Sequence, residues 1–422
     1  MDFTLPEDLQ AYLAELDEFI EREIKPLEAQ DDNIRFFDHR REDARTDWDR
    51  GGLPTQEWEA LLAEARARAD AAGHFRYAFP ASYGGRDGTN LGMAVIREHL
   101  ASKGLGLHCD LQNEHAIVGN NVGLLLMLHY GSEAQKAEWA DDLAAGRRHF
   151  AFGITEPDHG SDATFMETQA ERDGDDWVIN GEKTWNTGMH TASDDLVFAR
   201  TSGAPGSGTG ITAFLVPVGT PGFTVDEFLW TFNMPTDHAH VTLDHVRVPD
   251  SAILGEEGRG LAVVQHFFNE NRIRQAASSL GAAQFCINQA VAYAKERKPF
   301  GKALASNQAI QFPLVELQTQ AEMLRALIHK TAWSMDTYGP LTQSDKVSMC
   351  NYVANRLCCE AADRAMQVFG GLGYSRYQPF EHIYRHHRRY RITEGAEEIQ
   401  LRRVAGYLFG FIKPETLKGV TS

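Results

Sequence analysis

The stretch that most constrains this chain is Arg388-Arg389-Tyr390-Arg391-Ile392-Thr393-Glu394-Gly395-Ala396-Glu397-Glu398-Ile399-Gln400. The carboxylate of Glu394 directly precedes a glycine, and glycine permits tight or left-handed turns that other residues resist. The apolar periodicity that follows predicts a helix, carried by Ile399, Leu401, Val404, Ala405 and Leu408. We therefore expect Glu394 at a loop-to-helix junction, and we interpret Glu397 and Glu398 as first-turn acids that complement the helix dipole.

Length and charge narrow the class of protein. The 422 residues exceed one ordinary core and predict two or three domains, and a hydrophobic content of 43% is sufficient to fold them. Asp and Glu number 59 against 41 Lys and Arg, which gives a net charge of −18. This balance disfavours binding to nucleic acid or to an anionic membrane surface.

The N-terminal segment and the cysteines favour a cytoplasmic location. The segment from Met1 to Asp8 is acidic and lacks the basic region and apolar core of a signal peptide. No apolar run approaches the ~18 residues that a membrane span requires. The five cysteines form no Cys-x-x-Cys pair, so we expect core thiols in a reducing compartment and no metal site.

The succession of helical and strand patterns along the sequence predicts a multi-domain α–β–α organisation. Residues 1–149 are expected to form an N-terminal helical domain, residues 150–257 a small β-barrel or sandwich domain, and residues 258–422 a C-terminal helix bundle. In the first segment, the initial helical pattern is predicted to break at Pro26. Further helices are predicted at 91–102, 115–130 and 133–145.

The middle segment is rich in turn signals. Asn180-Gly181 lies between two short runs, Trp177–Ile179 and Glu182–Trp185, and predicts a hairpin with a two-residue turn. Other strands are predicted at 196–200, 211–217, 223–228 and 240–248.

Four helices are predicted in the last segment. The first stops at Pro299, and the second is capped by Ser306 or Asn307 and ends at Gly339-Pro340. The third reaches Gly370-Gly371, and the fourth follows Glu394 and ends near Phe409.

Three motifs occur in order along the chain. They are Phe152-Gly153-Ile154-Thr155-Glu156-Pro157-Asp158-His159-Gly160-Ser161-Asp162, then Glu296-Arg297-Lys298-Pro299-Phe300-Gly301 with Gln308, and then Gln367-Val368-Phe369-Gly370-Gly371-Leu372-Gly373-Tyr374 with Glu394-Gly395. Together, with a β-domain between helical segments, they resemble the acyl-CoA dehydrogenase family over nearly the whole chain. The resemblance implies FAD as cofactor.

The resemblance assigns the first motif to the flavin ring and pyrophosphate. The matching residues are Phe152, Ile154, Thr155, Ser161, Trp185 and Thr187. Taken alone, a Thr or Ser in such a turn more often bonds local backbone, and a lone Trp in a strand more often fills a core.

The resemblance assigns the second and third motifs to the FAD of a neighbouring subunit. The matching residues are Arg297, Phe300, Gln308, Gln367, Gly370 and Gly371. A guanidinium can bind phosphate bidentately, and glycines let backbone approach phosphate closely. The resemblance thus implies a homo-oligomer, a dimer of dimers, although a helix-ending cation and a glycine C-cap are the plainer interpretations.

The implied reaction is α,β-desaturation of an acyl-CoA thioester in fatty acid metabolism. By resemblance, Glu394 removes the α-proton, hydride passes from Cβ to flavin N5, and Arg272, Ser161 and Gly395 bind substrate. The backbone N–H of Glu394 and a ribityl hydroxyl would polarise the thioester carbonyl. Some relatives carry the base on an earlier helix, but that position here is Asn271 and not an acid.

The electron acceptor separates the implied function from its alternatives. The expected acceptor is an electron-transfer flavoprotein, whereas an acyl-CoA oxidase would use the same base and pass electrons to oxygen. A nucleic-acid-binding flavoprotein on this fold is disfavoured by the net charge of −18.

Several positions depart from the family pattern and indicate an outlying subgroup. They are His159, Phe165, His386, Thr393, Ala396 and Glu398. Phe267, Phe268 and Met234 are candidates for an apolar lining that would make the Glu394 carboxylate a stronger base.

Overall fold

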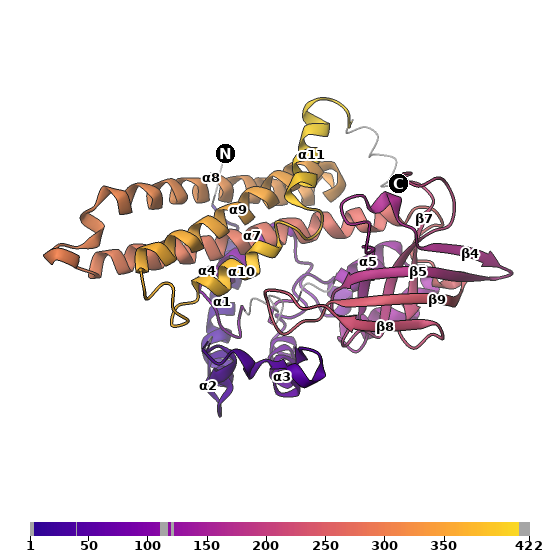
Figure 1. Cartoon of the computed structure of the whole chain (residues 1–422), viewed down its shortest axis with the longest axis horizontal. Helices are drawn as coiled ribbons and strands as arrows, with labels where there is room; N and C mark the ends of the chain where they lie inside the picture. The colour runs from indigo at the N-terminus through magenta and orange to yellow at the C-terminus, as the bar shows by residue number, and fades with distance from the viewer. Residues whose placement is uncertain (1–3, 39, 110–116, 120–121, 413–422) are drawn as a thin grey trace. The chain divides into compact units, whose positions relative to one another are not determined.

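The computed structural model describes residues 4–38, 40–109, 117–119 and 122–412. The chain folds into two compact units (Figure 1). Unit 1 contains residues 1–44, 56–119 and 269–422, and unit 2 contains residues 45–55 and 120–268. Helices, then strands, then helices follow one another along the chain, which confirms the predicted α–β–α class. The three residue boundaries drawn from the sequence stay a prediction.

The N-terminal helix continues through Pro26, where the sequence predicted a break. α1 (Glu7–Phe19) passes through a π-helical segment (Ile20–Ile24) into α2 (Lys25–Ala29). Pro26 stands in the first turn of α2, where a missing N–H and a fixed φ are tolerated. The predicted break was therefore wrong.

Unit 1 is otherwise built from long helices joined by short 3₁₀ segments. The helices are α3 (Gln56–Ala71), α4 (Asn90–Ser102), α7 (Gly260–Glu296, in this unit from Asn269), α8 (Gln308–Tyr338), α9 (Ser344–Phe369), α10 (Phe380–Arg389) and α11 (Glu397–Leu408). The 3₁₀ segments are Asn33–Phe36, Glu42–Ala44, Ala81–Tyr83, Pro299–Gly301, Leu304–Ser306 and Pro340–Gln343. Asn307 caps α8 through its side chain, so one of the two predicted caps is confirmed. The sequence did not predict α10.

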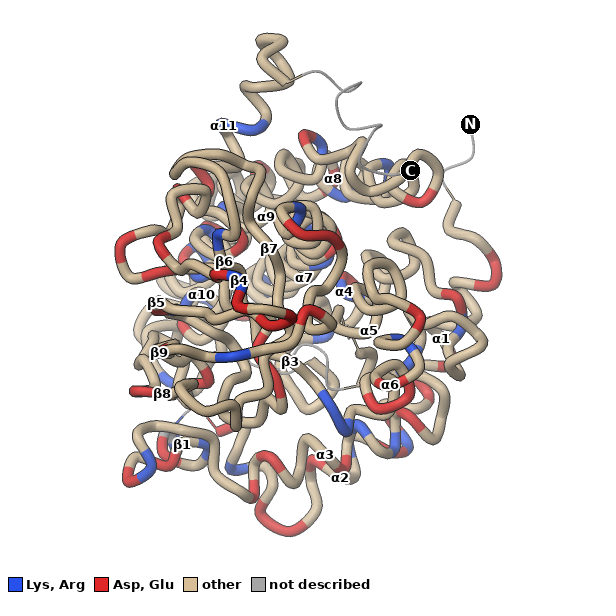
Figure 2. The backbone as a smooth tube through the Cα atoms, turned by 90° about the vertical axis from the view of Figure 1, so that its right-hand side faces the viewer, with Lys and Arg blue, Asp and Glu red and all other residues tan. Residues whose placement is uncertain are grey.

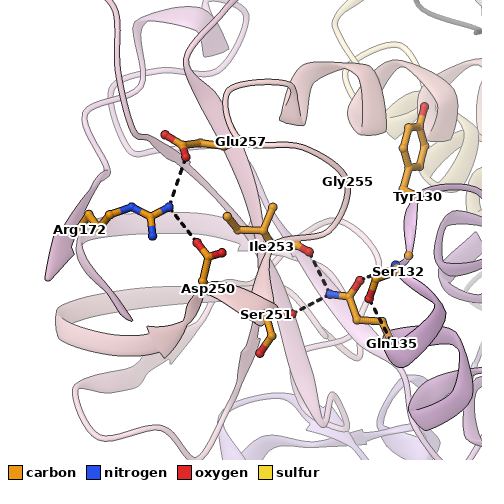
Figure 3. A pocket seen from close by; sticks show the side chains of 10 residues that line it. Tyr130, Ser132, Gln135, Arg172, Asp250, Ser251, Ile253, Gly255 and Glu257 are labelled. Atoms are coloured by element: carbon orange, nitrogen blue, oxygen red, sulfur yellow. Dashed lines mark hydrogen bonds and ion pairs between the residues drawn. The ribbon is translucent and has the colours of Figure 1, made fainter. Parts of the chain in front are cut away.

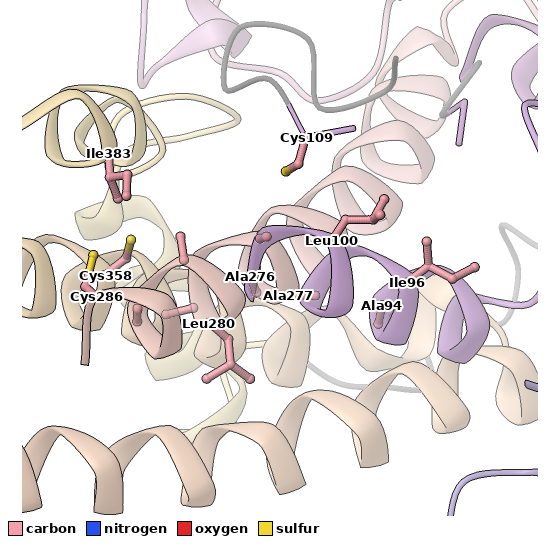
Figure 4. Close-up of a cluster of buried hydrophobic side chains, with 14 of the residues drawn as sticks. Ala94, Ile96, Leu100, Cys109, Ala276, Ala277, Leu280, Cys286, Cys358 and Ile383 are labelled. Carbon is pink, nitrogen blue, oxygen red and sulfur yellow. The ribbon is translucent and has the colours of Figure 1, made fainter. Parts of the chain in front are cut away.

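A single apolar core joins the N-terminal and C-terminal helices of unit 1. Figure 4 shows side chains of α4, among them Ile96 and Leu100, beside Ala277 and Leu280 of α7. Cys358 of α9 and further apolar residues of α10 belong to the same cluster. Burying a large aliphatic side chain stabilises a fold by roughly 1.5–3 kcal/mol. Packing on this core fixes the helices α7 and α9, which carry the polar residues described below.

Unit 2 contains a seven-stranded sheet with the order β3-β6-β4-β5-β9-β8, and β7 pairs with β6. β3 runs parallel to β6, and most other neighbours are antiparallel. The strands are β3 (Phe150–Gly153), β4 (Gln169–Asp173), β5 (Asp176–Asn186), β6 (Asp194–Arg200), β7 (Ile211–Pro217), β8 (Phe223–Phe228) and β9 (Ala239–Pro249). β6 is buried along its whole length, as expected for a strand inside a sheet.

Asn180-Gly181 is a bulge in β5, and not the turn of a hairpin. β5 runs without interruption from Asp176 to Asn186, and its register against β9 shifts between Ile179 and Gly181. A Cβ on Gly181 would lie 2.4 Å from the hydroxyl oxygen of Thr168, so the glycine permits close strand contact. The predicted hairpin was therefore wrong. The two-residue turn lies earlier, between Asp173 of β4 and Asp176 of β5.

Two helices and a short strand pair complete unit 2. They are α5 (Val122–Tyr130), α6 (Glu133–Ala144), β1 (Thr46–Asp47) and β2 (Leu53–Pro54), with 3₁₀ segments at Trp48–Arg50, Ala163–Phe165 and Asp250–Ala252. Residues 115, 116, 120 and 121 of the helix predicted at 115–130 lie outside the described residues. Figure 2 shows basic positions interspersed with acidic ones along the chain. None of the described helices combines the length and apolar character that a membrane crossing requires.

Candidate active site

Glu394 lies in unit 1, in the loop between α10 and α11. Its own backbone is left-handed, with φ +50°, and Gly395 follows at φ +89°. Left-handed backbone is unfavourable for a residue with a side chain and occurs where surrounding contacts impose it. The junction predicted from the sequence is therefore present in this structure, with Glu394 sharing the strained turn.

Two side-chain amides of α7 hold the carboxylate of Glu394. Asn271 Nδ2 donates to Oε1 at 2.8 Å, and Gln275 Nε2 donates to Oε2 at 2.6 Å. The two amides are four residues apart and so share one face of the helix. Each carboxylate oxygen thus accepts a hydrogen bond from a neutral donor.

Other side chains fix the backbone of this turn. Arg272 donates from Nε to the carbonyl oxygen of Glu394 at 3.0 Å, and its Nη2 contacts the same oxygen. Gln400 Nε2 donates to the carbonyl oxygens of Glu394 and Gly395, at 3.1 and 2.8 Å. Burial lowers the pKa of Arg272 to about 9, with a further contribution from Arg403, whereas Glu394 acts in the opposite direction. A buried guanidinium therefore clamps the carbonyl of Glu394.

Glu397 has a different role from Glu394. Arg391 donates to both oxygens of Glu397 at 2.8 Å, and Arg356 donates to the same pair at 3.1 and 3.2 Å. These hydrogen bonds, that of Arg391 first, lower the pKa of Glu397 to about 2. Glu397 is in the first turn of α11, as predicted, and it also anchors that helix to α9.

The residues assigned to a neighbouring FAD lie at one end of the bundle in unit 1. Tyr293 of α7 stacks on Phe369 of α9 with ring centroids 4.1 Å apart, which brings together the ends of both helices. The residues that the resemblance assigns to the FAD lie at or beyond those ends and are exposed, and they are Arg297, Phe300, Gln308, Gln367, Gly370 and Gly371. Phe300 is fully exposed at φ +53°, and a Cβ on Gly370 or Gly371 would meet no atom within 4 Å.

Phe152 of β3 belongs to an aromatic cluster in unit 2. Its ring centroid lies 4.5 Å from that of Phe267, 6.4 Å from Phe268 and 5.1 Å from Phe198. Phe267 and Phe268, two of the three residues predicted to form an apolar lining, thus lie together. The third, Met234, lies against Gly52, since a Cβ there would be 2.5 Å from its methyl carbon.

The other predicted flavin contacts lie at the ends of β3 and β5. Ile154 and Thr155 directly follow β3 and are half-buried, and Ser161 is exposed in the loop beyond them. Trp185 of β5 is 49% exposed and left-handed, with φ +65°. Beside it, Thr187 Oγ1 lies 3.0 Å from His238 Nδ1.

A buried ionic cluster supports the turn after β3. Lys183 of β5, fully buried, donates from Nζ to Glu156 Oε1 at 2.8 Å and to the carbonyl of Ile154 at 3.3 Å. Glu156 also accepts from the backbone N–H groups of Thr168 and Glu167. Burial would raise the pKa of Glu156, but Lys183 and these donors lower it overall.

Nearby, Asp195 of β6 is fully buried and accepts from Asn186 Nδ2 at 2.6 Å. Burial raises the pKa of Asp195 to about 7.

A shallow pocket of about 390 Å³ lies elsewhere on unit 2 (Figure 3). Gln135 donates there to the carbonyl oxygens of Ser251 and Ile253, both at 2.9 Å, and Arg172 contacts Asp250 and Glu257. The bonds from Gln135 tie α6 to the segment after β9. None of the residues predicted from the motifs lines this pocket.

Comparison with known proteins identifies the family. Models of the N-terminal, middle and C-terminal domains of acyl-CoA dehydrogenase match residues 29–147, 151–246 and 258–409. The glutaryl-CoA dehydrogenase of Desulfococcus multivorans is 32% identical over 404 residues, which cover 94% of this chain and 96% of that protein. The chain belongs to the acyl-CoA dehydrogenase family. The resemblance stated from the three motifs is confirmed, and members of this family are FAD-dependent oxidoreductases.

Solved structures of the family share the fold. Butyryl-CoA dehydrogenase from Megasphaera elsdenii has a TM-score of 0.80 at 30% identity, covering 97% of this chain and all of that chain. A chain in a structure described as the electron transferring flavoprotein of Acidaminococcus fermentans has a TM-score of 0.78 at 27% identity, covering 97% and 99%. The fold is thus the three-domain acyl-CoA dehydrogenase fold, with a curled sheet between helical domains.

The residues of unit 2 fit the FAD of an acyl-CoA dehydrogenase. An exposed indole, Trp185, offers a flat apolar surface to an aromatic ring, with the Thr187 hydroxyl beside it. Among the described residues, neither the N–H nor the hydroxyl of Thr155 has a hydrogen-bond partner. Such groups are the donors that a flavin or a phosphate accepts from.

The departures from the family pattern are accommodated locally. His159 lies 3.1 Å from Asp162 Oδ2, and this contact raises the pKa of His159. Phe165 packs near His159 and over Gly206, where a Cβ would lie 2.8 Å from the Phe165 ring. Ala396 leaves α11 without a side-chain cap. His386 is fully buried, and burial lowers its pKa well below the ordinary value.

Sequence reasoning missed the amides around the base. Gln275, Asn351, Asn355 and Gln400 did not stand out individually, because an Asn or Gln on a helix is most often exposed. A signal was present in their spacing. Asn271, Gln275 and Ser279 recur every fourth residue on α7, and Asn351 and Asn355 do so on α9. Glu156 and Lys183 were likewise missed, because their pairing joins positions far apart in sequence.

Proposed function

We propose that this acyl-CoA dehydrogenase desaturates an acyl-CoA thioester between Cα and Cβ, with Glu394 as the base that removes the α-proton. The observation that carries the proposal is the geometry of Glu394. Among the described residues, its carboxylate accepts hydrogen bonds only from neutral amides, while Arg272 holds its carbonyl. Asn271 occupies the alternative base position and acts as a donor to Glu394. This arrangement leaves Glu394 able to accept a proton.

The turn of Glu394 also offers a hydrogen-bond donor. Within the described part of the chain, the backbone N–H of Glu394 has no acceptor. We infer that it donates to the thioester carbonyl of the substrate, where negative charge develops as the α-proton leaves. Removal of a proton by Glu394 and stabilisation of the resulting charge by its own N–H would thus come from one residue.

We infer that Phe152, Ile154, Thr155, Ser161, Trp185 and Thr187 hold the FAD in unit 2. When bound, FAD supplies the acceptor for the hydrogen that leaves Cβ with its electron pair. The α-proton goes to Glu394, and the product is the 2-enoyl-CoA thioester. The aromatic cluster around Phe152 supports a site from which water is excluded.

We propose a homo-oligomer, a dimer of dimers, in which the exposed corner between α7 and α8 reaches the FAD of a neighbouring subunit. Two exposed side chains support a partner surface there: Phe300, and the guanidinium of Arg297, which forms no ion pair within the described part of the chain. We further propose an electron-transfer flavoprotein as electron acceptor, supported by the similar chain in the Acidaminococcus fermentans structure. A cytoplasmic location is supported by five buried cysteines, all free.

Flavin bleaching under anaerobic conditions tests the proposed function. The panel should begin with butanoyl-CoA and glutaryl-CoA, because similar proteins are named for those substrates, and extend to longer and branched chains. We expect at least one acyl-CoA to bleach the flavin and to yield the 2-enoyl-CoA. Absence of bleaching with the whole panel would contradict the function. Rapid stoichiometric peroxide on admission of air would instead favour an oxidase.

A further inference from the structure

The two amides that donate to Glu394 differ in the hydrogen bonds that they accept from other side chains. Gln275, which donates to Glu394 Oε2 at 2.6 Å, accepts in turn from Asn351 of α9. The distance from Asn351 Nδ2 to Gln275 Oε1 is 3.3 Å. The carboxylate is therefore connected through Gln275 to a second helix of unit 1.

The connection continues into the bundle. Asn355 Nδ2, one turn further along α9, donates to Asn351 Oδ1 at 3.2 Å. Ser279 Oγ of α7 donates to Asn355 Oδ1 at 2.7 Å and lies 2.9 Å from Nδ1 of His387 in α10. Five side chains on three helices thus form one continuous line of hydrogen bonds that ends at Glu394.

All five side chains are buried. Gln275 is 5% exposed, Asn351 is 1% exposed, and Asn355, Ser279 and His387 are fully buried. Buried polar groups are costly unless bonded, so a complete line of such groups restricts the helices to one arrangement. We call Gln275, Asn351, Asn355, Ser279 and His387 the amide relay.

Backbone carbonyls set the direction of the relay. Asn351 Nδ2 also donates to the carbonyl oxygen of Arg272 at 3.2 Å, and Asn355 Nδ2 donates to that of Tyr390 at 2.9 Å. Flipping either amide would place its oxygen against a carbonyl oxygen. Each amide therefore turns its NH₂ group toward the Glu394 end of the relay.

The direction of the amides determines the far end of the relay. Because Asn355 presents its oxygen to Ser279, the Ser279 hydroxyl must donate to Asn355. Ser279 Oγ then accepts from His387, so Nδ1 of His387 carries a hydrogen. Every donor in the line points toward the carboxylate.

We propose that the amide relay is the positioning device for the catalytic base: a polarised line of hydrogen bonds that holds the Glu394 carboxylate in place. Donors arranged head to tail strengthen one another. The relay residues do not touch the reacting atoms and act through Glu394. This inference rests on the proposed role of Glu394 as base.

Charged groups from each neighbouring element also act near Glu394. Arg272 on α7 contacts its carbonyl, Arg403 on α11 acts on Arg272, and Glu397 on α11 is neutralised by Arg391 and by Arg356 of α9. On α10, Arg389 adjoins the buried His386. Substituting Gln275 leaves all of these charges in place, so its effect isolates the relay.

The hydrogen position on His387 tests the relay without reference to activity. Magic-angle-spinning NMR of [15N]histidine-labelled holoenzyme, assigned by comparison with His387→Gln, should show hydrogen on Nδ1. In Asn355→Leu, the Ser279 hydroxyl loses its acceptor and becomes able to donate to His387, so the hydrogen should move to Nε2. Wild-type His387 with an unprotonated Nδ1 would overturn the proposal.

The rate of flavin bleaching tests the consequence for the base. In Gln275→Leu, the Glu394 carboxylate loses one of its two donors, so the bleaching rate at saturating acyl-CoA should fall about tenfold, while the acyl-CoA concentration that gives half of that rate stays at the wild-type value. Gln284→Leu, which removes another side-chain amide of α7, one that donates to Gln318 of α8, should leave both quantities unchanged. A wild-type rate at saturating acyl-CoA in Gln275→Leu would overturn the proposal. Failure of wild-type enzyme to bleach with any acyl-CoA would contradict the proposed function instead, and the NMR result would then decide the relay.

Discussion

Glu394 in unit 1 and Glu156 in unit 2 both lie in loops and both accept hydrogen bonds on each carboxylate oxygen, but their donors differ. Glu394 accepts from two neutral side-chain amides, Asn271 and Gln275. Glu156 accepts from the ammonium of Lys183 and from two backbone N–H groups. Glu394 is half-buried, whereas Glu156 is 5% exposed.

The difference separates a carboxylate available for chemistry from one that serves the fold. An ammonium next to a carboxylate strongly favours its ionised form and so opposes the uptake of a proton. Neutral amides exert a weaker effect. The donors around a carboxylate therefore predict its role better than its burial does.

Breaking the ionic cluster should have the largest effect on stability. Lys183→Met leaves Glu156 buried without its counter-charge, and removing one member of a buried pair costs about 3–5 kcal/mol. Urea unfolding of the holoenzyme, followed by tryptophan fluorescence, should show this loss. The matched control is Lys136→Met, which breaks a partly exposed pair with Glu133 in the same unit and should cost less than about 1 kcal/mol. Equal costs for the two variants would contradict the structural role of the cluster.

Arg297 extends the comparison of charged groups and their partners, because the partner of this exposed cation is expected to be the FAD of a neighbouring subunit. Arg297→Ala should weaken FAD retention and oligomer assembly together, by roughly tenfold to a hundredfold, as expected for a charge-assisted bond of about 1.5–3 kcal/mol. Flavin content and sedimentation after dilution measure both. Lys302→Ala at the same corner is the control, and it should change neither. Full flavin content and intact assembly in Arg297→Ala would show that no such contact crosses the interface.

A smaller effect should appear in the pH dependence of stability. Burial, aided by Arg389, lowers the pKa of His386, so the folded protein keeps this residue neutral below pH 6.5, where the unfolded chain takes up a proton. Stability from this residue is complete above that pH and is lost as pH falls, by up to about 1.4 kcal/mol per pH unit. His386→Gln should reduce this slope, as measured by calorimetry with excess FAD. His245→Gln, at an exposed site, should not reduce it. An unchanged slope in His386→Gln would contradict a neutral buried histidine.

The sequence predicted most of the fold where the signal was local. The strands β7 and β8 and the end of α9 at Phe369 followed from alternation, helical period and glycines. Asn180-Gly181 was wrongly predicted to be a hairpin turn, because the same dipeptide that forms a tight turn also permits a bulge where Thr168 approaches closely. α10 was missed because its ten residues are dominated by His and Arg, and its apolar face is limited to residues such as Phe380 and Ile383.

The candidate site likewise combines a part that a local motif predicted with a part that depends on long-range contacts. Glu394-Gly395 was visible as a motif, and its junction is present in the structure. The clamp by Arg272 and the amide relay join α7, α9 and α10 across more than seventy residues, and no local pattern specifies such pairings. Tertiary packing alone brings those side chains together, so their roles could not be predicted from the sequence.

The central claim is that Glu394 removes the α-proton, and anaerobic flavin bleaching by the best acyl-CoA in Glu394→Gln tests it most directly. The substitution keeps the size and polarity of the side chain but removes the carboxylate. The bleaching rate should fall by about 10²–10⁴-fold, while flavin content stays at the wild-type level. Glu270→Gln, which alters a neighbouring carboxylate paired with Arg274, should bleach within a few-fold of wild type. Near wild-type bleaching in Glu394→Gln, with slow bleaching in Glu270→Gln, would show that Glu394 is not the base.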